Sequence, residues 1–258
     1  SESFLIASAA DKKAVIIEKT PDDLDVYDPQ KDFIVCANHF QSKGLTGSKK
    51  NREQMQESAS PYRYERMMEL LDANGKNSVQ KTVNILRDRG GLHGADIGMG
   101  NEKAVNQLIA HHSIVFEPEK LKVWVSTAPW QLGKYVAYDL NKVFSLKGMK
   151  RNQEISDSNL TIAADTFLTT TAYQHFLQFR QMKQTIMDGG DINPDSLVAA
   201  NPQFYHAWVL AGDYAYKHDQ YKKALYFYQQ ALTKEIATLK EKEHITKQIS
   251  KISKKITP

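Results

Sequence analysis

The sequence predicts an α+β protein, with antiparallel strands and helices in residues 1–145 and helices alone in residues 160–258. Two observations carry this prediction. Short β-rich runs recur about every ten residues near the N-terminus, a spacing typical of an antiparallel meander. Helical periodicity fills the C-terminal region from Leu160 onward. The polar residues 146–159 lie between the two regions and are expected to form a linker.

The first strands are expected within the first 38 residues. Four apolar or alternating runs occur there, at residues 4–7, 14–18, 24–27 and 33–38. Turn-forming residues separate them, since Asp, Asn, Gly and Pro favour turns for distinct backbone reasons. We therefore expect four antiparallel strands. The following residues, 41–58, are polar and are expected to form a surface loop.

Two helices and a hairpin are expected next. Ser60 is a suitable N-cap with Pro61 at the first helical position, and Asn74-Gly75 ends that helix. A second helix is expected over residues 78–87. The five glycines within residues 90–100 predict a flexible loop rather than a regular element. Two further strands are expected in the order of the chain, at residues 113–116 and 121–126, joined by a Pro-containing turn.

Composition excludes several classes of protein. Of the 258 residues, 41% are hydrophobic and 25% charged, which is ordinary for a globular protein with a sizeable core. The net charge of +4 comes from the lysines of residues 234–255, so no broad basic face for nucleic acid is expected. No apolar run reaches the roughly 18 residues that span a membrane. Cys36 is the single cysteine, which excludes an internal disulfide and leaves the compartment open, cytoplasm and bacterial periplasm alike.

Three segments of the first 145 residues stand in an order and spacing that match a known family. They are the paired runs of residues 4–21, the run 35–40 with its Asn38-His39 pair, and the helix of residues 60–72. Together they resemble the isopenicillin-N acyltransferases, a branch of the N-terminal-nucleophile (Ntn) hydrolases related to the choloylglycine hydrolases. The resemblance implies part of an αββα sandwich, here as its C-terminal portion, followed by a helical tail.

The resemblance also implies a chemistry. It is hydrolysis of a small-molecule amide, or acyl transfer, through a covalent acyl-enzyme formed on an N-terminal Cys that self-cleavage exposes. No Cys begins this chain, so we expect the nucleophile on an upstream segment or separate chain, and this chain by itself to be inactive. Asn38 matches the residue of the family that donates to the oxyanion, a role suited to an uncharged amide. No metal or organic cofactor is implied.

Ser1 and Cys36 are alternative nucleophiles within this chain. Ntn nucleophiles are Cys, Ser or Thr residues at the start of a chain, just before a strand, and Ser1 fits this description. Alternatively, Ser1 is only the residue at which the chain begins. Cys36 shares a strand face with Asn38, two positions later, and its other interpretation is a small buried hydrophobe.

Several residues are candidates for lining the substrate pocket. His39 follows Asn38 and is expected to be structural or pocket-lining rather than a base. Arg63 either binds a substrate carboxylate or joins an ion-paired helix face with neighbouring glutamates. His111, His112 and Ser113 are expected at the pocket edge. No metal site is expected there, because no further ligand stands at a suitable spacing.

The helical tail carries one segment that resembles a tetratricopeptide repeat (TPR). Its matching residues are Trp208, Gly212, Tyr221, Ala224, Tyr228 and Ala231. A single repeat does not make a free-standing solenoid, which takes about three. The alternative function is therefore a TPR-type interaction or scaffold protein, with a protein partner at residues 160–258 and a catalytically inactive front domain. The lysine-rich residues 234–255 are expected to form a solvated helix face.

Overall fold

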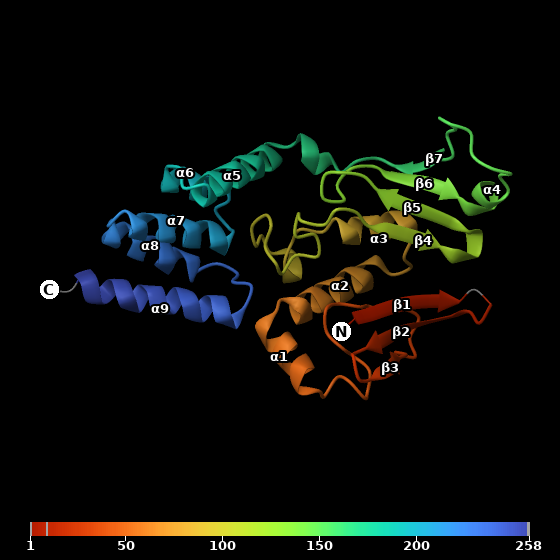
Figure 1. The fold of residues 1–258 in the computed structure, drawn as a ribbon, viewed down its shortest axis with the longest axis horizontal. Helices are drawn as coiled ribbons and strands as arrows, with labels where there is room; N and C mark the ends of the chain where they lie inside the picture. Colours follow the sequence, from red (N-terminus) through yellow and green to blue (C-terminus); the bar gives the residue numbers. More distant parts are fainter. Residues whose placement is uncertain (1, 9, 257–258) are drawn as a thin grey trace. The chain divides into compact units, whose positions relative to one another are not determined.

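The computed structural model describes residues 2–8 and 10–256, and its elements form two antiparallel sheets, the helices around them and a C-terminal helical region (Figure 1). The predicted α+β class is confirmed. The chain divides into two compact units. The first comprises residues 1–55, 60–88 and 108–165, and the second residues 56–59, 89–107 and 166–258. The boundaries expected at residues 145 and 160 stay a prediction.

The first sheet is an antiparallel meander of β1 (Glu2–Ser8), β2 (Lys13–Lys19) and β3 (Leu24–Tyr27), in that order. Ile16 and Glu18 lie two positions apart on β2, so they share a face, and both are fully buried. The first three predicted strands are therefore formed, and one face of the sheet is a wall on which later residues pack.

The fourth predicted strand is not formed. Residues 33–37 belong to no ladder among the described residues. Side chains bind backbone groups here instead: the Gln41 Nε2 donates to the Val35 carbonyl at 2.8 Å, and the Phe40 amide donates to the Asn51 Oδ1 at 2.7 Å. β-rich composition favours an extended chain, but a strand also needs a neighbouring strand to take its backbone hydrogen bonds.

The predicted surface loop of residues 41–58 contains a helix, α1 (Lys49–Glu57). Its sequence is rich in Lys, Arg, Gln and Glu, which have high helix propensity, and the Ser48 hydroxyl accepts from the Asn51 amide at 3.3 Å. Asn51 is the buried residue of this helix. The apolar stripe that reveals an amphipathic helix is missing, so periodicity could not detect it.

The two predicted helices are α2 (Ser60–Asn74) and α3 (Val79–Leu86). Ser78 is the N-cap of α3, and its side chain accepts from the Lys81 amide. A buried guanidinium joins α2 to the chain after α3. The Arg66 Nε and Nη2 each donate to an Asp88 carboxylate oxygen at 2.9 Å, a bidentate pair. Arg66 is thus buried, and its Nη1 also donates to the Glu69 carboxylate on the same helix at 3.0 Å.

The second sheet has the antiparallel order β4-β5-β6-β7. Its strands are β4 (Ile114–Glu117), β5 (Lys122–Ser126), β6 (Tyr135–Asp139) and β7 (Asp157–Ile162). The β4–β5 hairpin confirms the prediction. The sequence did not reveal β6. Strand β7 begins at Asp157, within the expected linker of residues 146–159, and it takes the place of the helical structure expected from Leu160.

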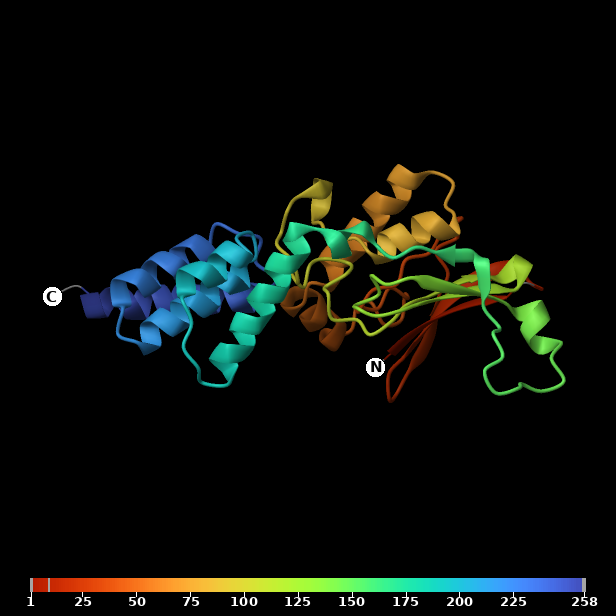
Figure 2. The same cartoon turned by 90° about the horizontal axis from the view of Figure 1, so that it is seen from above.

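Helix α3 covers one face of the second sheet (Figure 2). The Trp124 Nε1 also donates to the Leu160 carbonyl at 2.8 Å, which links β5 to β7. A short helix, α4 (Leu140–Phe144), follows β6. The core between α3 and the sheet consists of Val83, Val115, Trp124, Tyr135 and Ala137.

The second unit is helical, apart from the glycine-rich residues. These contain a 3₁₀ turn at Leu92–Gly94. Gly98 has φ of 81°, and a Cβ there would lie 2.2 Å from the Phe204 amide nitrogen, so a glycine is required. The longer helices are α5 (Thr171–Met187), α6 (Pro194–Ala200), α7 (Tyr205–Lys217), α8 (Tyr221–Ala231) and α9 (Leu239–Ile256).

Helices α7 and α8 pack closely through small residues. A Cβ on Gly212 would lie 3.0 Å from the Tyr228 ring, and Ala224 and Ala231 are fully buried. Close helix pairing through small residues is what the TPR-like pattern predicts, but the repeat assignment itself stays a prediction. No helix in the described part of the chain is long and apolar enough to cross a membrane.

Candidate active site

A cleft of about 740 Å³ opens in the first unit between β1, residues 36–40 and α1. It contains the Asn38-His39 pair that the sequence singled out. Its walls are formed by Glu2, Ser3, Phe4, Cys36, Ala37, Asn38, His39, Phe40, Lys50, Asn51 and Gln54.

Two carboxylates of the first sheet hold the chain that follows Asn38. Glu18 accepts from the backbone amides of Gln41 at 2.7 Å and Ser42 at 2.9 Å. Asp25 accepts from the Gly44 amide at 2.7 Å. Glu18 and Asp25 are directly opposite in the β2–β3 register, so they lie on the same face. These charge-assisted bonds fix residues 41–44 on the sheet.

Asn51 holds the same segment from the side of α1. Its Oδ1 accepts from the Phe40 amide, while its Nδ2 donates to the carbonyls of Phe40 and Thr46, both at 3.0 Å. A buried side-chain amide with both ends bonded acts as a backbone substitute. Asn51 therefore borders the cleft but is engaged in holding residues 40–46.

Asn38 lies exposed at the cleft, and its side chain is oriented by Arg63. The Arg63 Nη2 donates to the Asn38 Oδ1 at 2.7 Å. A guanidinium can only donate, so the contact identifies the oxygen end of the amide. Within the described residues the Asn38 Nδ2 has no acceptor, which leaves its two N–H groups for a bound molecule.

His39 is buried in the wall beside Asn38. Its Nδ1 lies 2.8 Å from the Ser60 Oγ, and its ring meets the Tyr64 ring edge-on with centroids 5.6 Å apart. Burial lowers the pKa of His39; the negative charge of Glu18 opposes this change and the positive charge of Arg63 adds to it. The imidazole is therefore neutral at neutral pH.

Cys36 is half-buried in the cleft wall. Burial raises the pKa of its thiol, the negative charge of Glu18 raises it further, and a hydrogen bond with Ser3 acts in the opposite direction. The thiolate is the nucleophilic form of cysteine, so this environment suppresses its reactivity. Ser1, the other alternative nucleophile, lies outside the described residues.

The remaining candidates lie elsewhere in the first unit. His111 and His112 are exposed in the chain before β4. The Ser113 amide donates to the Ser126 Oγ at 2.7 Å, and its hydroxyl pairs with the Tyr135 hydroxyl. None of the three lines the cleft, and their pocket role stays a prediction. The described residues contain no cluster of three or more His, Cys, Asp or Glu that could hold a metal ion.

Sequence reasoning assigned no site role to Glu18, Asn51 and Ser60, which hold the chain around Asn38 and His39 in place. Glu18 could have been noticed, because it is an acidic residue two positions after Ile16 in an apolar strand, on the face that Ile16 buries. Asn51 and Ser60 carried no such signal. Asn51 stands in a wholly polar segment, and Ser60 already had a sufficient explanation as an N-cap.

Comparison with known proteins identifies the family. The family model for acyl-coenzyme A:6-aminopenicillanic acid acyl-transferase matches residues 1–129, which is half of the chain and includes every residue of the cleft. Neither the curated proteins nor the solved structures contain a significant match. The order of segments around Asn38 and this match agree, and the chain belongs to the acyl-coenzyme A:6-aminopenicillanic acid acyl-transferase family.

Proposed function

We propose that this chain forms part of an acyl-transfer or amide-hydrolysis site in which Asn38 stabilises the oxyanion of a covalent acyl-enzyme pathway. Family membership supports acyl transfer as the reaction class. The observation that carries the proposal is the contact of the Arg63 Nη2 with the Asn38 Oδ1 at 2.7 Å, at the cleft. The substrate class is a small-molecule amide or acyl donor.

The geometry of Asn38 suits an oxyanion donor. Attack on a carbonyl places negative charge on its oxygen, and an N–H group already aimed at that position stabilises the charge without reorganisation. Because Arg63 engages the Oδ1, the Asn38 Nδ2 is the end left to donate. The guanidinium also polarises the amide, which strengthens its N–H donors.

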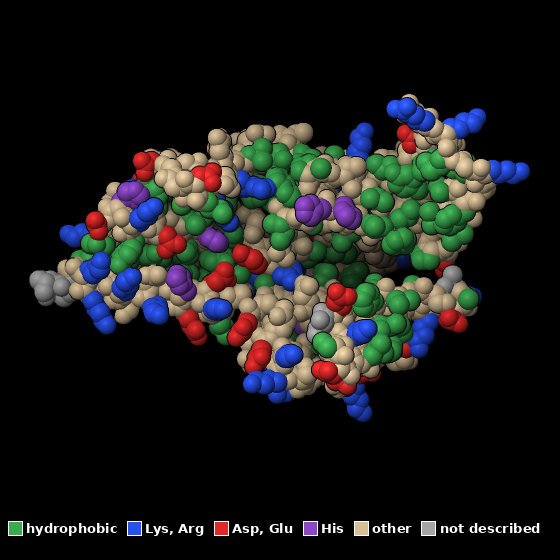
Figure 3. Space-filling model, in the orientation of Figure 1, with side chains coloured by type: hydrophobic (Ala, Val, Ile, Leu, Met, Phe, Trp, Pro, Cys, Tyr) green, Lys and Arg blue, Asp and Glu red, His purple; other side chains and the backbone are tan. Residues whose placement is uncertain are grey.

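The nucleophile in this proposal lies on a segment outside these 258 residues, upstream or on a separate chain, and is exposed by self-cleavage. The order of the first sheet supports such a segment, because β1 stands at its edge. Phe4, Leu5 and Ile6 of β1 are 46%, 56% and 47% exposed, and Figure 3 shows hydrophobic side chains gathered over this sheet. An added strand would pair with the free backbone N–H and C=O groups of β1 and border the cleft.

The test is turnover of the complete, self-processed protein with Asn38→Ala. We expect kcat to fall by about 10²–10³-fold, the typical effect of removing one oxyanion donor. Asn84→Ala, an exposed amide of α3 outside the cleft, is the matched control and should leave kcat unchanged. Wild-type turnover in Asn38→Ala would refute the oxyanion role.

Arg63 is assigned a positioning role, and a graded series tests it. We expect Arg63→Gln to lower kcat by about tenfold and Arg63→Lys, which still donates a charged hydrogen bond, to recover part of the loss. If Arg63 instead binds a substrate carboxylate, KM rises while kcat stays near the wild-type value. The kcat–KM split therefore separates the two roles.

Cys36 offers the discriminating measurement for a nucleophile within this chain. The raised pKa of its thiol predicts no acyl adduct when the purified chain is incubated with an activated acyl ester and analysed by mass spectrometry. Cys36→Ala in the complete protein should retain acyl transfer. An adduct on Cys36, or on Ser1, would replace the proposal with a nucleophile inside the chain.

A further inference from the structure

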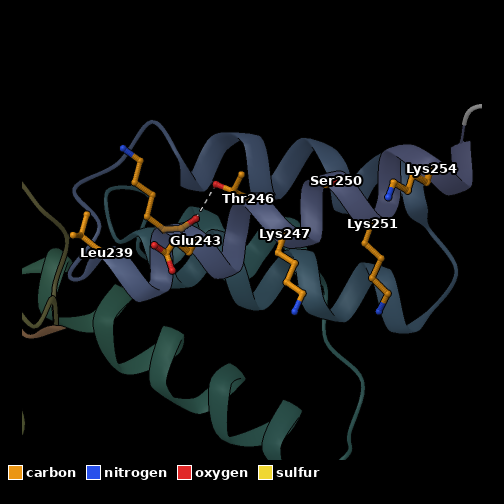
Figure 4. Close-up of a pocket in the computed structure, with 8 residues that line it drawn as sticks. Leu239, Glu243, Thr246, Lys247, Ser250, Lys251 and Lys254 are labelled. Carbon is orange, nitrogen blue, oxygen red and sulfur yellow. Dashed lines mark hydrogen bonds between the residues drawn. The ribbon is translucent and has the colours of Figure 1, made fainter.

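Helix α9 presents a groove of about 690 Å³ on its exposed face (Figure 4). Lysine side chains form much of its walls, and two small hydroxyl residues lie between them. Figure 4 shows Lys247 and Lys251 projecting from the same side of the helix. The residues that shape the groove are Lys242, Thr246, Lys247, Ser250, Lys251 and Lys254.

The opposite face of α9 holds the helix in place. Ile245 and Ile252 are buried to 1% and 0% exposure, and α9 packs against α8. A helix whose apolar stripe is buried presents its polar face in a fixed orientation. The groove is therefore preformed rather than created by the binding of another molecule.

The groove carries positive charge that the described residues do not neutralise. No ion pair is found in the described chain for Lys242, Lys247 or Lys254, and all three are exposed. The Lys251 ammonium lies 4.8 Å from the centre of the Tyr216 ring, a cation–π contact that leaves its charge in place. Glu243 is the acidic residue of the lining.

We propose that this groove binds an acidic amphipathic helix of a partner protein. Lys247, Lys251 and Lys254 are four and three residues apart, or about 6 and 4.5 Å along the axis. Carboxylates at i, i+4 and i+7 on a facing helix have the same spacing. The small side chains of Thr246 and Ser250 allow a second helix to approach closely between the lysine rows.

Further features of the groove favour an acidic helix over other anions. Leu239, 64% exposed, stands at one end and offers an apolar anchor to an amphipathic partner. Glu243 would repel a phosphate backbone but can pair with a single basic residue of a protein, which would set its direction. Among the described residues that line the groove, there is no row of large apolar side chains to insert into a membrane surface.

The test measures binding of the full chain to a labelled 15-residue Ala/Glu peptide with glutamates on one helical face, by fluorescence anisotropy at low salt. A peptide of the same composition with its glutamates scattered around the helix is the ligand control. We expect saturable binding, weaker by about tenfold for the scattered peptide. Binding should also weaken as salt rises, because exposed charges are screened.

Charge reversal locates the site. Lys247→Glu with Lys254→Glu should weaken binding by at least about tenfold, while Lys147→Glu with Lys150→Glu, the same charge change in an exposed loop, should stay within about twofold. A peptide with lysines in place of its glutamates should bind the Lys247→Glu/Lys254→Glu variant better than it binds the wild type. Unchanged far-UV circular dichroism confirms that each variant folds.

Four outcomes would overturn the proposal. They are no saturable binding by the wild type, equal affinity for both acidic peptides, equal losses in the two charge-reversed variants, and tighter binding of single-stranded DNA or phosphatidylserine vesicles than of the peptide. None of them bears on acyl transfer, which depends on the cleft of the first unit.

Discussion

The chain beside the cleft and the helix pair of the second unit satisfy their backbones in opposite ways. Residues 35–44 form no regular element, and side chains such as Glu18 and Asn51 bind their amides and carbonyls. Helices α7 and α8 bond within themselves and touch through Gly212 and a row of alanines. The structure of residues 35–44 depends on particular polar side chains, whereas the packing of α7 against α8 depends on the volume of the side chains between them.

This difference has consequences for function. A backbone held by side-chain carboxylates and amides can take a shape that no helix or sheet provides, which is how Asn38 comes to the cleft. Such a segment is sensitive to substitution of the supporting side chains, because the loss of one of them leaves backbone amides without hydrogen-bond partners. A helix pair tolerates substitutions that conserve side-chain volume.

The largest expected effect is on Glu18. Glu18→Ala leaves the part-buried amide of Gln41 and the buried amide of Ser42 unpaired, so the free energy of unfolding should fall by about 4 kcal/mol. Glu53→Ala, an exposed residue of α1, should change it by less than about 0.5 kcal/mol. Urea denaturation measures both. Near-equal losses of unfolding free energy in the two variants would mean that Glu18 does not hold Gln41 and Ser42 on the sheet.

A smaller effect is expected in the helix pair. Gly212→Val adds branched bulk where even a Cβ would lie 3.0 Å from the Tyr228 ring. Overpacking of this kind lowers the free energy of unfolding by about 2 kcal/mol. Gly47→Ala, where a Cβ meets nothing within 4 Å, is the control and should be near neutral. Thermal unfolding monitored by circular dichroism distinguishes them, and an unaffected Gly212→Val would show that α7 and α8 are not closely packed in solution.

The smallest expected effect is on the pH dependence of stability, through the buried His39. Burial lowers the pKa of His39, so the unfolded state binds its proton more readily than the folded state does. The stabilising contribution is complete above the ordinary pKa of about 6.5 and is lost as pH falls through the lowered value. Urea midpoints should therefore decline between pH 7.5 and 5, and decline less in His39→Gln.

His111→Gln is the control for that series, because His111 is exposed and its variant should follow the wild-type profile. Burial also lowers the pKa of His206, to about 4, and this residue adds a loss of the same sign from the second unit. His206 is present in every variant, so the difference between the profiles isolates His39. Identical profiles for His39→Gln and wild type would contradict the assigned environment.

Local signals predicted the elements that local interactions determine. The limits of α2 follow from Ser60-Pro61 and Asn74-Gly75, and α3 lies within the residues 78–87 where the second helix was expected. The β4–β5 hairpin follows from its turn. The elements that the sequence did not reveal either pair with a strand outside their own segment or lack a periodic apolar pattern. Strand β7 forms by pairing with β6, and helix α1 has no apolar stripe.

The sequence by itself determined the α+β class, the resemblance to an acyltransferase family, and the candidacy of Asn38. Only the tertiary structure decided what surrounds that residue. Arg63 is 25 residues from Asn38 in the chain, and Glu18 is 23 and 24 residues from the amides it binds. Helix caps and turns act over a few residues and leave a sequence signature. Side-chain bonds across such separations depend on how the sheet and helices pack, so no local pattern records them.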